Sequence, residues 1–220
     1  MAARWSETEI PLFAEKRIND PKAALKLLAE EARGCTRCDL YKNATQTVFG
    51  EGPADAHMML VGEQPGDQED LTGRPFVGPA GIVLDKALEA AGIERASVYI
   101  TNAVKHFKNE PRGKRRLHKK PDTSEIDICR FWLDNEIEIV RPRIVVALGA
   151  TAARGLMRKT VTINATRGRL ITLPGGAQGL ITVHPSYILR IEEERDKRRE
   201  FAHLVKDLQL AREAASHAQR

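Results

Sequence analysis

The chain has 220 residues, of which 42% are hydrophobic and 30% are charged, a composition typical of a globular protein with a hydrophobic core. No apolar stretch approaches the roughly 20 residues of a membrane span, and residues 1–15 lack the apolar core of a signal peptide, so we expect a cytoplasmic protein without a membrane partner. The net charge of +5 suits a polyanionic partner, although the sign of the charge alone identifies none.

The first part of the chain predicts two helices and a strand. Asp20 followed by proline is a good helix start, and helical spacing of apolar residues continues over 21–33. Residues 57–61 form a short apolar strand that leads into a loop rich in glycine and proline over 62–81. A second helix is expected over 82–91, where a glycine ends it.

The middle of the chain predicts a strand over 98–101 and then a long polar loop over 105–122. A loop of this length is uncommon inside a compact domain, so it is a candidate for function. Asp122 or Ser124 then caps a helix that continues to about residue 140.

The last part of the chain continues the alternation of strands and helices. Residues 144–148 are almost continuously apolar, which is typical of a central parallel strand. A short helix follows over 150–157, and two further strands are expected over 169–173 and 180–183. A charged helix over 195–215 completes the pattern.

This alternation predicts one three-layer α/β/α domain with a mainly parallel central sheet over residues 1–220, with disorder possible over 213–220. We expect the protein to be a monomer. Ligands bind beyond the carboxyl ends of the strands in such sheets. The turn 62–66 and the segments 102–106 and 184–186 are expected at those ends.

The turn Gly62–Gly66 is the first candidate for chemistry. Its glycines allow backbone amides to approach a flat ligand, and Glu63 and Asp67 add carboxylates. The alternative is a tight connection between a strand and a helix with no further role.

The segment that leaves the last strand is the second candidate. A proline after His184 fixes the backbone and holds the imidazole rigidly, and Arg190 is placed to reach a phosphate. The alternative is a histidine that packs in the core.

Four segments together resemble motifs of the uracil-DNA glycosylase superfamily, in particular its iron–sulfur family 4-like members. In chain order these segments are Gly62–Gly66, Gly73–Gly81, Thr101–Lys105, and His184–Ser186 with Arg190. The resemblance extends from about Cys35 to Arg190 and implies the fold of that superfamily. It also implies excision of uracil from DNA, for which the base must leave the stack and enter a pocket.

The resemblance assigns uracil binding to six residues, namely Gly62, Gln64, Gly66, Phe76, Asn102 and His184. The amide of Asn102 both donates and accepts, which matches O4 and N3–H of uracil, whereas cytosine presents the reverse pattern. Phe76 would stack on the pyrimidine, unless it is simply a core residue. His184 would donate to O2, where negative charge develops as uracil leaves. The region of Gln64 and Gly66 would supply backbone amides.

The three cysteines acquire a role through the same resemblance, since an odd and small number of cysteines argues against disulfides. Cys35, Cys38 and Cys129 match three ligands of a [4Fe-4S] cluster, and His106 stands where a further cysteine is usual. Zinc is the chemical alternative, because a C-x2-C pair does not discriminate between the two. An incomplete site with His106 at the surface is the remaining alternative.

The stretch 113–120 contains five cationic side chains around His118, and alone it would be read as a solvated loop. Lys114–His118 resembles the K-R-R-I-H signature of the UdgX branch, with leucine for isoleucine. That resemblance implies attack of His118 on C1′ of the sugar and a covalent protein–DNA adduct. A carboxylate should orient the imidazole, with Glu63 the first choice and Asp67 the second.

The expected partner is uracil-containing DNA, with single strands accepted. Contacts to the DNA backbone are assigned to five residues, namely Lys114, Arg115, Arg116, Ser186 and Arg190. Two alternatives remain open: a glycosylase that turns over, with His118 as a phosphate contact, and a non-enzymatic nucleic-acid-binding iron–sulfur protein or redox sensor.

Overall fold

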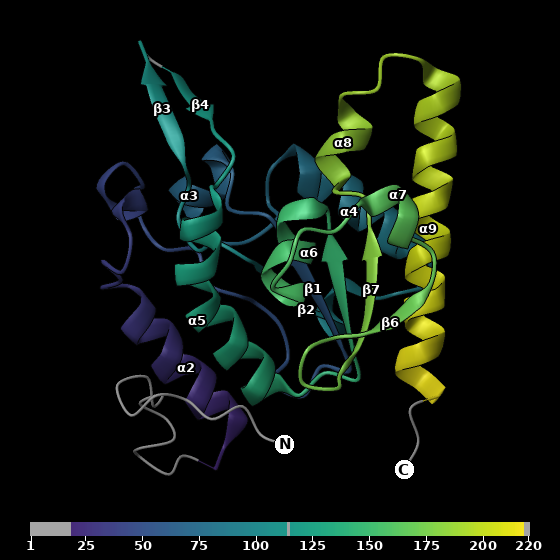
Figure 1. The fold of residues 1–220 in the computed structure, drawn as a ribbon, viewed down its shortest axis with the longest axis horizontal. Helices are drawn as coiled ribbons and strands as arrows, with labels where there is room; N and C mark the ends of the chain where they lie inside the picture. The colour runs from purple at the N-terminus through teal and green to yellow at the C-terminus, as the bar shows by residue number, and fades with distance from the viewer. Residues whose placement is uncertain (1–18, 114, 218–220) are drawn as a thin grey trace.

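The computed structural model describes residues 19–113 and 115–217, in which helices enclose a central sheet (Figure 1). The sheet contains, from edge to edge, β2 (Tyr99–Asn102), β1 (Met58–Gly62), β5 (Ile144–Leu148), β7 (Gln178–Thr182) and β6 (Leu170–Thr172). The first four strands are parallel, and β6 pairs with β7 in antiparallel fashion. The predicted α/β fold with a mainly parallel sheet is confirmed.

The register of the parallel strands determines where the functional segments meet. Leu60 in β1 lies between Ile100 of β2 and Val146 of β5, and every residue of β1 and β5 is buried. The register continues to Gly62 beside Asn102 at the carboxyl ends. Continuous apolar runs therefore form the central strands, and the residues that follow them gather at one edge of the sheet.

The longer helices are α2 (Pro21–Ala32), α4 (Pro79–Ala90), α5 (Thr123–Val140), α6 (Ala150–Met157) and α9 (Glu194–His217). Leu84 of α4 and Leu208 of α9 pack with Leu60 on one face of the sheet. Leu133 of α5 and Met59 of β1 belong to the core on the opposite face, with α6 beside them. Helix α2 packs on the outside of α5 and completes that side (Figure 1).

The predicted loop over 105–122 is the largest error of the sequence-based fold. It contains an antiparallel hairpin of β3 (Asn109–Arg112) and β4 (Arg115–His118), which projects from the body (Figure 1). Asn109 pairs with His118 at the base of this hairpin. Gly113 at the turn has a φ of 60°, which favours glycine, and Lys114 lies outside the described residues.

Several short elements were also not predicted, namely α3 (Asp67–Thr72), α7 (Ile163–Thr166), α8 (Pro185–Leu189), and the 3-10 helices Asp39–Lys42 and Arg95–Ser97. Helix α9 extends to His217, so the disorder considered for 213–220 is wrong for 213–217, and residues 218–220 lie outside the described part. Within residues 19–113 and 115–217, no helix is both long and apolar enough to cross a membrane.

Candidate active site

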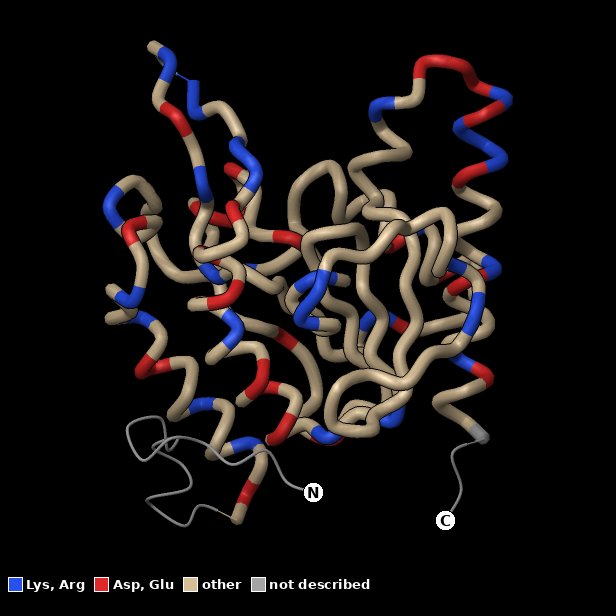
Figure 2. Tube along the Cα trace, viewed as in Figure 1, with Lys and Arg blue, Asp and Glu red and all other residues tan. Residues whose placement is uncertain are grey.

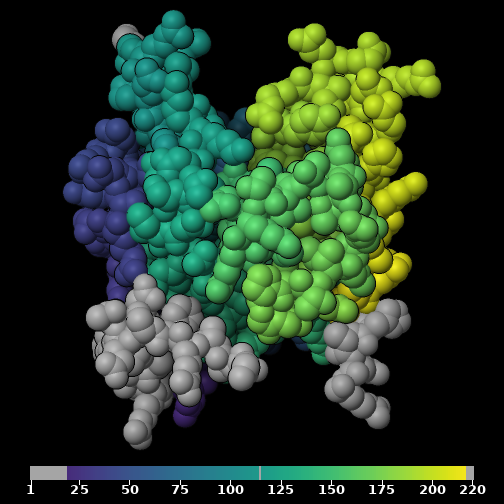
Figure 3. Space-filling model, viewed as in Figure 1, coloured from purple at the N-terminus to yellow at the C-terminus, as the bar shows by residue number. Residues whose placement is uncertain are grey.

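A cleft with a volume of about 1250 Å³ lies at the carboxyl ends of the parallel strands. Its floor and walls include Glu63 after β1, Asn102 at the end of β2, Gly149 after β5 and His184 after β7. The hairpin forms one side, and α8 with the start of α9 forms the other, so the surface is hollowed between them (Figure 3). The site is thus where parallel topology predicts it.

Asn102 sits at the base of the cleft and is only 2% exposed. Its Oδ1 atom is buried and has no hydrogen-bond partner among the residues that the structure describes. Gly62 does not line the cleft, but a Cβ atom there would lie 2.3 Å from Oδ1 of Asn102 and 2.5 Å from Cζ of Phe76. Gly62 therefore leaves room for these two side chains, which differs from the predicted contact with a ligand.

Phe76 forms a wall of the cleft in an unusual backbone conformation. Its φ is 54°, in the left-handed region that a bulky side chain rarely adopts. Gly81 makes this possible, because a Cβ atom there would lie 1.9 Å from the carbonyl oxygen of Phe76. The ring centroids of Phe76 and His184 are 5.8 Å apart, so an aromatic surface faces the interior of the cleft.

His184 is held in one tautomer by the segment that follows it. The backbone N–H of Ser186 donates to Nδ1 of His184 over 3.1 Å, and Oγ of Ser186 is 2.8 Å from the same atom. The neutral ring therefore carries its proton on Nε2, where it can act as a donor. Burial, together with the positive charges of Arg190 and His118, lowers the pKa of His184 to about 4. His184 is consequently neutral at pH 7.

His118 projects from the end of β4 to the rim of the cleft, with half of its side chain exposed. Its Nε2 atom is 3.6 Å from Oε1 of Glu63. The hydroxyl of Thr151 donates to Oε2, the second oxygen of that carboxylate. Glu63, the first choice from the sequence, is thus the carboxylate that faces His118, whereas Asp67 bonds Arg116 at 2.7 Å.

Gln64 connects β1 to the hairpin. Its Oε1 accepts from the backbone N–H of Lys108 over 3.0 Å, and its Nε2 donates to the carbonyl of Lys119 over 2.9 Å. The same Nε2 lies 2.9 Å from Nε2 of His118. These bonds fix the amide as a donor to the imidazole. The side chain therefore binds the hairpin. Gln64 and Gly66 both line the cleft, and their predicted contact with uracil stays a prediction.

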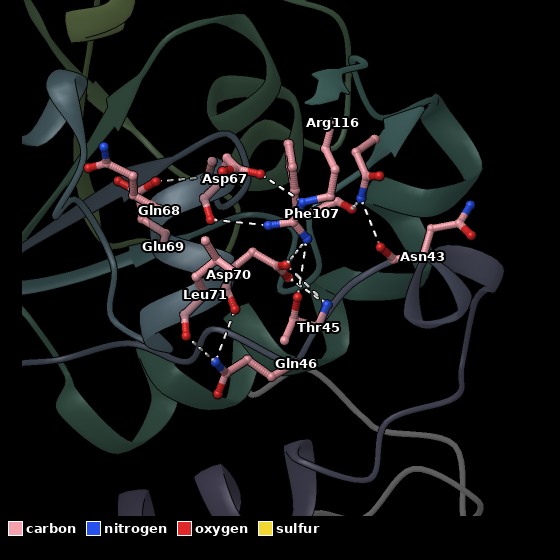
Figure 4. A network of polar contacts seen from close by, with 12 residues as sticks. Asn43, Thr45, Gln46, Asp67, Gln68, Glu69, Asp70, Leu71, Phe107 and Arg116 are labelled. Carbon is pink, nitrogen blue, oxygen red and sulfur yellow. Dashed lines mark hydrogen bonds and ion pairs between the residues drawn. The ribbon is translucent and has the colours of Figure 1, made fainter. Parts of the chain in front are cut away.

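Arg116 lies inside a polar network, as Figure 4 shows. Its guanidinium donates to Asp67 over 2.7 Å, to Asp70 over 2.5 Å and to the hydroxyl of Thr45 over 3.1 Å. It also lies 5.3 Å from the centre of the Phe107 ring. Asp70 is fully buried, so the pair anchors the hairpin to α3. The guanidinium is thus engaged within the protein, and its predicted contact with the DNA backbone stays a prediction.

The other residues that were predicted to contact DNA lie in different parts of the structure. Ser186 and Arg190 line the cleft beside His184. Arg115 is exposed on the hairpin but does not line the cleft. Lys114 was predicted with them and lies outside the described residues.

The three cysteines have free thiols in the apolar cluster between α2 and α5. Trp132 Nε1 donates to Sγ of Cys35, and the backbone N–H of Lys105 donates to Sγ of Cys129, each over 3.2 Å. Burial raises the pKa of Cys129 to about 12, against the opposing charge of Lys105. Donors to sulfur are typical around thiolate ligands.

His106 is 4% exposed, and its Nδ1 atom is buried without a hydrogen-bond partner in the described part of the chain. This unpaired nitrogen suits a ligand role. No three His, Cys, Asp or Glu side chains in residues 19–113 and 115–217 are arranged to hold a metal ion. The donor chemistry therefore fits the predicted centre, while its four-ligand geometry is not confirmed.

A buried ion pair beneath the cleft escaped the sequence analysis. Lys105 and Glu136 have fully buried side chains whose charged atoms are 2.5 Å apart. Lys105 also donates to the carbonyl of Asn102 over 2.8 Å and to the hydroxyl of Thr101 over 2.6 Å. The pair holds the end of β2 in place. A glutamate on the apolar face of α5, three residues from the fully buried Leu133, was the available signal.

Glu69 is a second residue that the sequence analysis missed. It is 7% exposed and lines the cleft. Its carboxylate accepts from the backbone N–H of Gly66 over 3.1 Å and from that of Gly78 over 2.8 Å. One side chain thus ties together the two glycine-rich segments that flank the cleft.

Comparison with known proteins agrees with this geometry. The profile of the Uracil DNA glycosylase superfamily matches residues 49–209, which include the residues that line the cleft. The chain is 42% identical over 167 residues to the type-4 uracil-DNA glycosylase of Thermotoga maritima, covering 76% of this chain and 83% of that protein. It is 37% identical over 175 residues to the type-4 uracil-DNA glycosylase of Pyrobaculum aerophilum, covering 76% and 85%. For the protein of that name from Sulfurisphaera tokodaii, the identity is 36% over 194 residues, covering 81% and 85%.

Proposed function

The chain belongs to the uracil DNA glycosylase superfamily, and from this membership and the chemistry of its cleft we propose that it excises uracil from DNA in DNA repair. The observation that carries the proposal is the buried, unpaired Oδ1 of Asn102 at the base of the cleft. An unpaired buried acceptor costs free energy unless a ligand supplies a donor. The N3–H of uracil is such a donor, and the similarity to type-4 uracil-DNA glycosylases supports this choice of base.

The same amide accounts for discrimination between bases. Nδ2 of Asn102 donates to O4 of uracil, while Oδ1 accepts from N3–H. Cytosine presents a donor and an acceptor in the opposite order, so both amide atoms would be left unpaired. Phe76 offers its ring to the face of the flipped base, at the wall of the cleft.

His184 stabilises the departing uracil. When the bond between C1′ and N1 breaks, the electron pair leaves with N1 and negative charge spreads to O2. The Nε2–H of neutral His184 donates to O2 and stabilises this charge. The pKa of His184, near 4, keeps the imidazole neutral at pH 7, so the ring stabilises O2 by donating a hydrogen bond and not as an imidazolium.

His118 then attacks the cationic sugar. The proton of its neutral ring is on Nδ1, because Gln64 donates to Nε2. The lone pair of Nε2 leaves its hydrogen bond with Gln64 and forms the bond to C1′, and the Nδ1 proton passes to solvent, so a neutral N-linked imidazole results. Glu63, 3.6 Å from Nε2, stabilises the positive charge on the sugar and the ring. No water is consumed, so each molecule acts once.

The DNA backbone would lie across the open cleft between the hairpin and α8. Arg190 and Ser186 line the cleft, and Arg115 belongs to the hairpin on the opposite side. Lys114, proposed with them, lies outside the described residues. Figure 2 marks lysines and arginines on the hairpin and on the α8–α9 segment. Because the cleft is open between these two walls, we propose that a flexible single strand is accepted.

We also propose a [4Fe-4S] cluster held by Cys35, Cys38, Cys129 and His106, with zinc as the chemical alternative. Buried thiols that receive N–H donors and the unpaired Nδ1 of His106 support this assignment. The cluster would supply a cross-link between α5 and the segment that follows α2.

A glycosylase that turns over is the second candidate, and similarity to type-4 enzymes suits it equally well. Uracil release with DNA in excess separates the two. Covalent trapping stops near one uracil per protein, whereas turnover continues well beyond it. DNA binding with no uracil release would contradict both and favour a non-enzymatic binding protein.

Asn102→Ala tests the pocket itself. We expect kcat/KM for uracil release to fall on the order of a hundredfold or more, because two hydrogen bonds in a desolvated site are lost. The measurement is single-turnover release of uracil from a labelled oligonucleotide. Unchanged activity and unchanged preference for uracil over cytosine would mean that the base binds elsewhere.

A further inference from the structure

Thr151 lies in the first turn of α6, immediately beneath the rim of the cleft. It is 2% exposed, and its hydroxyl donates to Oε2 of Glu63. No sequence motif assigned a role to this residue. A buried hydroxyl aimed at a cleft carboxylate points to a positioning function.

The framework around Thr151 is rigid. Gly149, the residue before α6, donates its backbone N–H to the carbonyl of Thr182 at the end of β7, over 2.9 Å. The backbone N–H of Ala153 donates to the carbonyl of Gly149 over 3.0 Å, which closes the first helical turn. The start of α6, which carries Thr151, is thus tied to the strand that leads to His184. The first turn of a helix is also a favourable place for a carboxylate.

Glu63 has two oxygens with different partners. Oε2 receives the hydroxyl of Thr151, and Oε1 faces Nε2 of His118 at 3.6 Å. The Glu63 side chain is 23% exposed, and a glutamate at a cleft rim has several rotamers available. Because the hydroxyl of Thr151 binds Oε2, it favours the Glu63 rotamer in which Oε1 faces the imidazole of His118.

We infer that Thr151 is a positioning residue for covalent trapping, in that it orients Glu63 toward His118 and thereby toward the cationic sugar. This inference rests on the proposed function, because it assumes that Glu63 and His118 act on the sugar. Thr151 does not touch the DNA in this account. It determines the fraction of protein molecules in which the Glu63 carboxylate already faces His118 when uracil leaves.

The test compares Thr151→Val, which keeps the shape and removes the hydroxyl, with Thr151→Ser, which keeps the hydroxyl. We expect Thr151→Val to slow adduct formation about tenfold to a hundredfold, the range for losing a hydrogen bond to a charged group. Thr151→Ser should stay within about threefold of the wild type. Melting temperatures show whether each variant is folded, and Thr151→Ala replaces Thr151→Val if the latter is not. Equal rates for the folded hydroxyl-free variant and the wild type would overturn the inference.

A double-mutant cycle with Glu63→Gln separates positioning from a general structural effect. If Thr151 acts through Glu63, Thr151→Val has little further effect on adduct formation in the Glu63→Gln background. The NMR chemical shifts of the His118 ring without DNA should likewise change with Thr151→Val only when Glu63 is present. Equal effects in both backgrounds would contradict positioning. A wild-type protein that releases no uracil would instead refute the proposed function, and the NMR cycle would still test the contact.

Discussion

His184 is the residue whose chemistry is most constrained by its surroundings. The backbone N–H of Ser186 donates to its Nδ1, beside the hydroxyl of the same serine, and burial lowers its pKa to about 4, from an ordinary value near 6.5. A neutral donor on Nε2 is therefore available at pH 7. The ring of His184 therefore has one tautomer, with the proton on Nε2, and no charge at pH 7.

This pKa predicts how stability depends on pH. Below pH 6.5 the unfolded chain binds a proton at His184 that the folded protein does not, so the free energy of unfolding falls as pH decreases from about 6.5 to about 4. After allowance for partial exposure, the loss is on the order of 2 kcal/mol. Denaturant unfolding of the wild type and of His184→Asn, measured between pH 4 and pH 7, checks it. An identical slope in both proteins would contradict the assignment.

Sequence reasoning was most successful for residues that belong to the motifs resembling those of the family. Asn102, Phe76 and His184 were predicted for the site, and all three line one cleft. Their motifs carry backbone constraints, such as the proline after His184, that can be read locally. Thr151 could not be found in this way, because a threonine in a short helix has no pattern of its own and its contact lies 88 positions away, at Glu63.

At the scale of an element, the hairpin of β3 and β4 also depends on long-range contacts that the local sequence does not reveal. Pro111 and a run of charged residues give β3 and β4 little strand propensity, so the sequence indicates a loop. Gln64 and the Arg116 network hold the hairpin instead, and they join it to β1 and α3 through long-range contacts. Tertiary interactions override local propensity here, and they place His118 at the rim of the cleft.

Arg116→Ala should therefore act through the structure of the hairpin. It leaves the fully buried carboxylate of Asp70 without its cationic partner, which should cost about 2 kcal/mol or more of unfolding free energy. The rate of adduct formation should fall by a larger factor than the affinity for DNA. Denaturant unfolding and gel-shift titration provide the two measurements.

Arg115→Ala is the matched control on the same strand. Arg115 is exposed and forms no ion pair or side-chain hydrogen bond with another described residue. We expect the free energy of unfolding of this variant to differ from that of the wild type by less than about 0.5 kcal/mol. The salt dependence of its DNA binding should weaken. If Arg116→Ala behaves like this control, Arg116 is a phosphate contact after all.

At the scale of the whole molecule, the parallel sheet gathers at one edge the residues that follow four strands. The proposed cluster would add a second level of organisation, because it would join α5 to the chain that follows α2. The sequence indicated the ligands through their resemblance, in residue type and spacing, to the family 4 pattern. Their relative geometry depends on how α2 packs on α5, which spacing does not encode.

Cys129→Ser tests this centre. We expect the wild type to contain iron and acid-labile sulfide, and the variant to lose both and to melt about 5 °C lower or more, because metal binding contributes to folding. Elemental analysis and visible absorption provide the measurement. Stoichiometric zinc without iron would favour the zinc alternative, and a wild type free of both would contradict a metal centre.

The central claim is that His118 forms the bond to the sugar, and one denaturing gel tests it most directly. Wild type and His118→Ser are incubated with excess uracil-containing single-stranded DNA, and any protein–DNA band is mapped by mass spectrometry of its peptides. We predict a stable wild-type band attached through His118. The variant should form no band but should release uracil with turnover, because water then reaches C1′. A wild type without a band, or a band that persists in His118→Ser, would contradict the account.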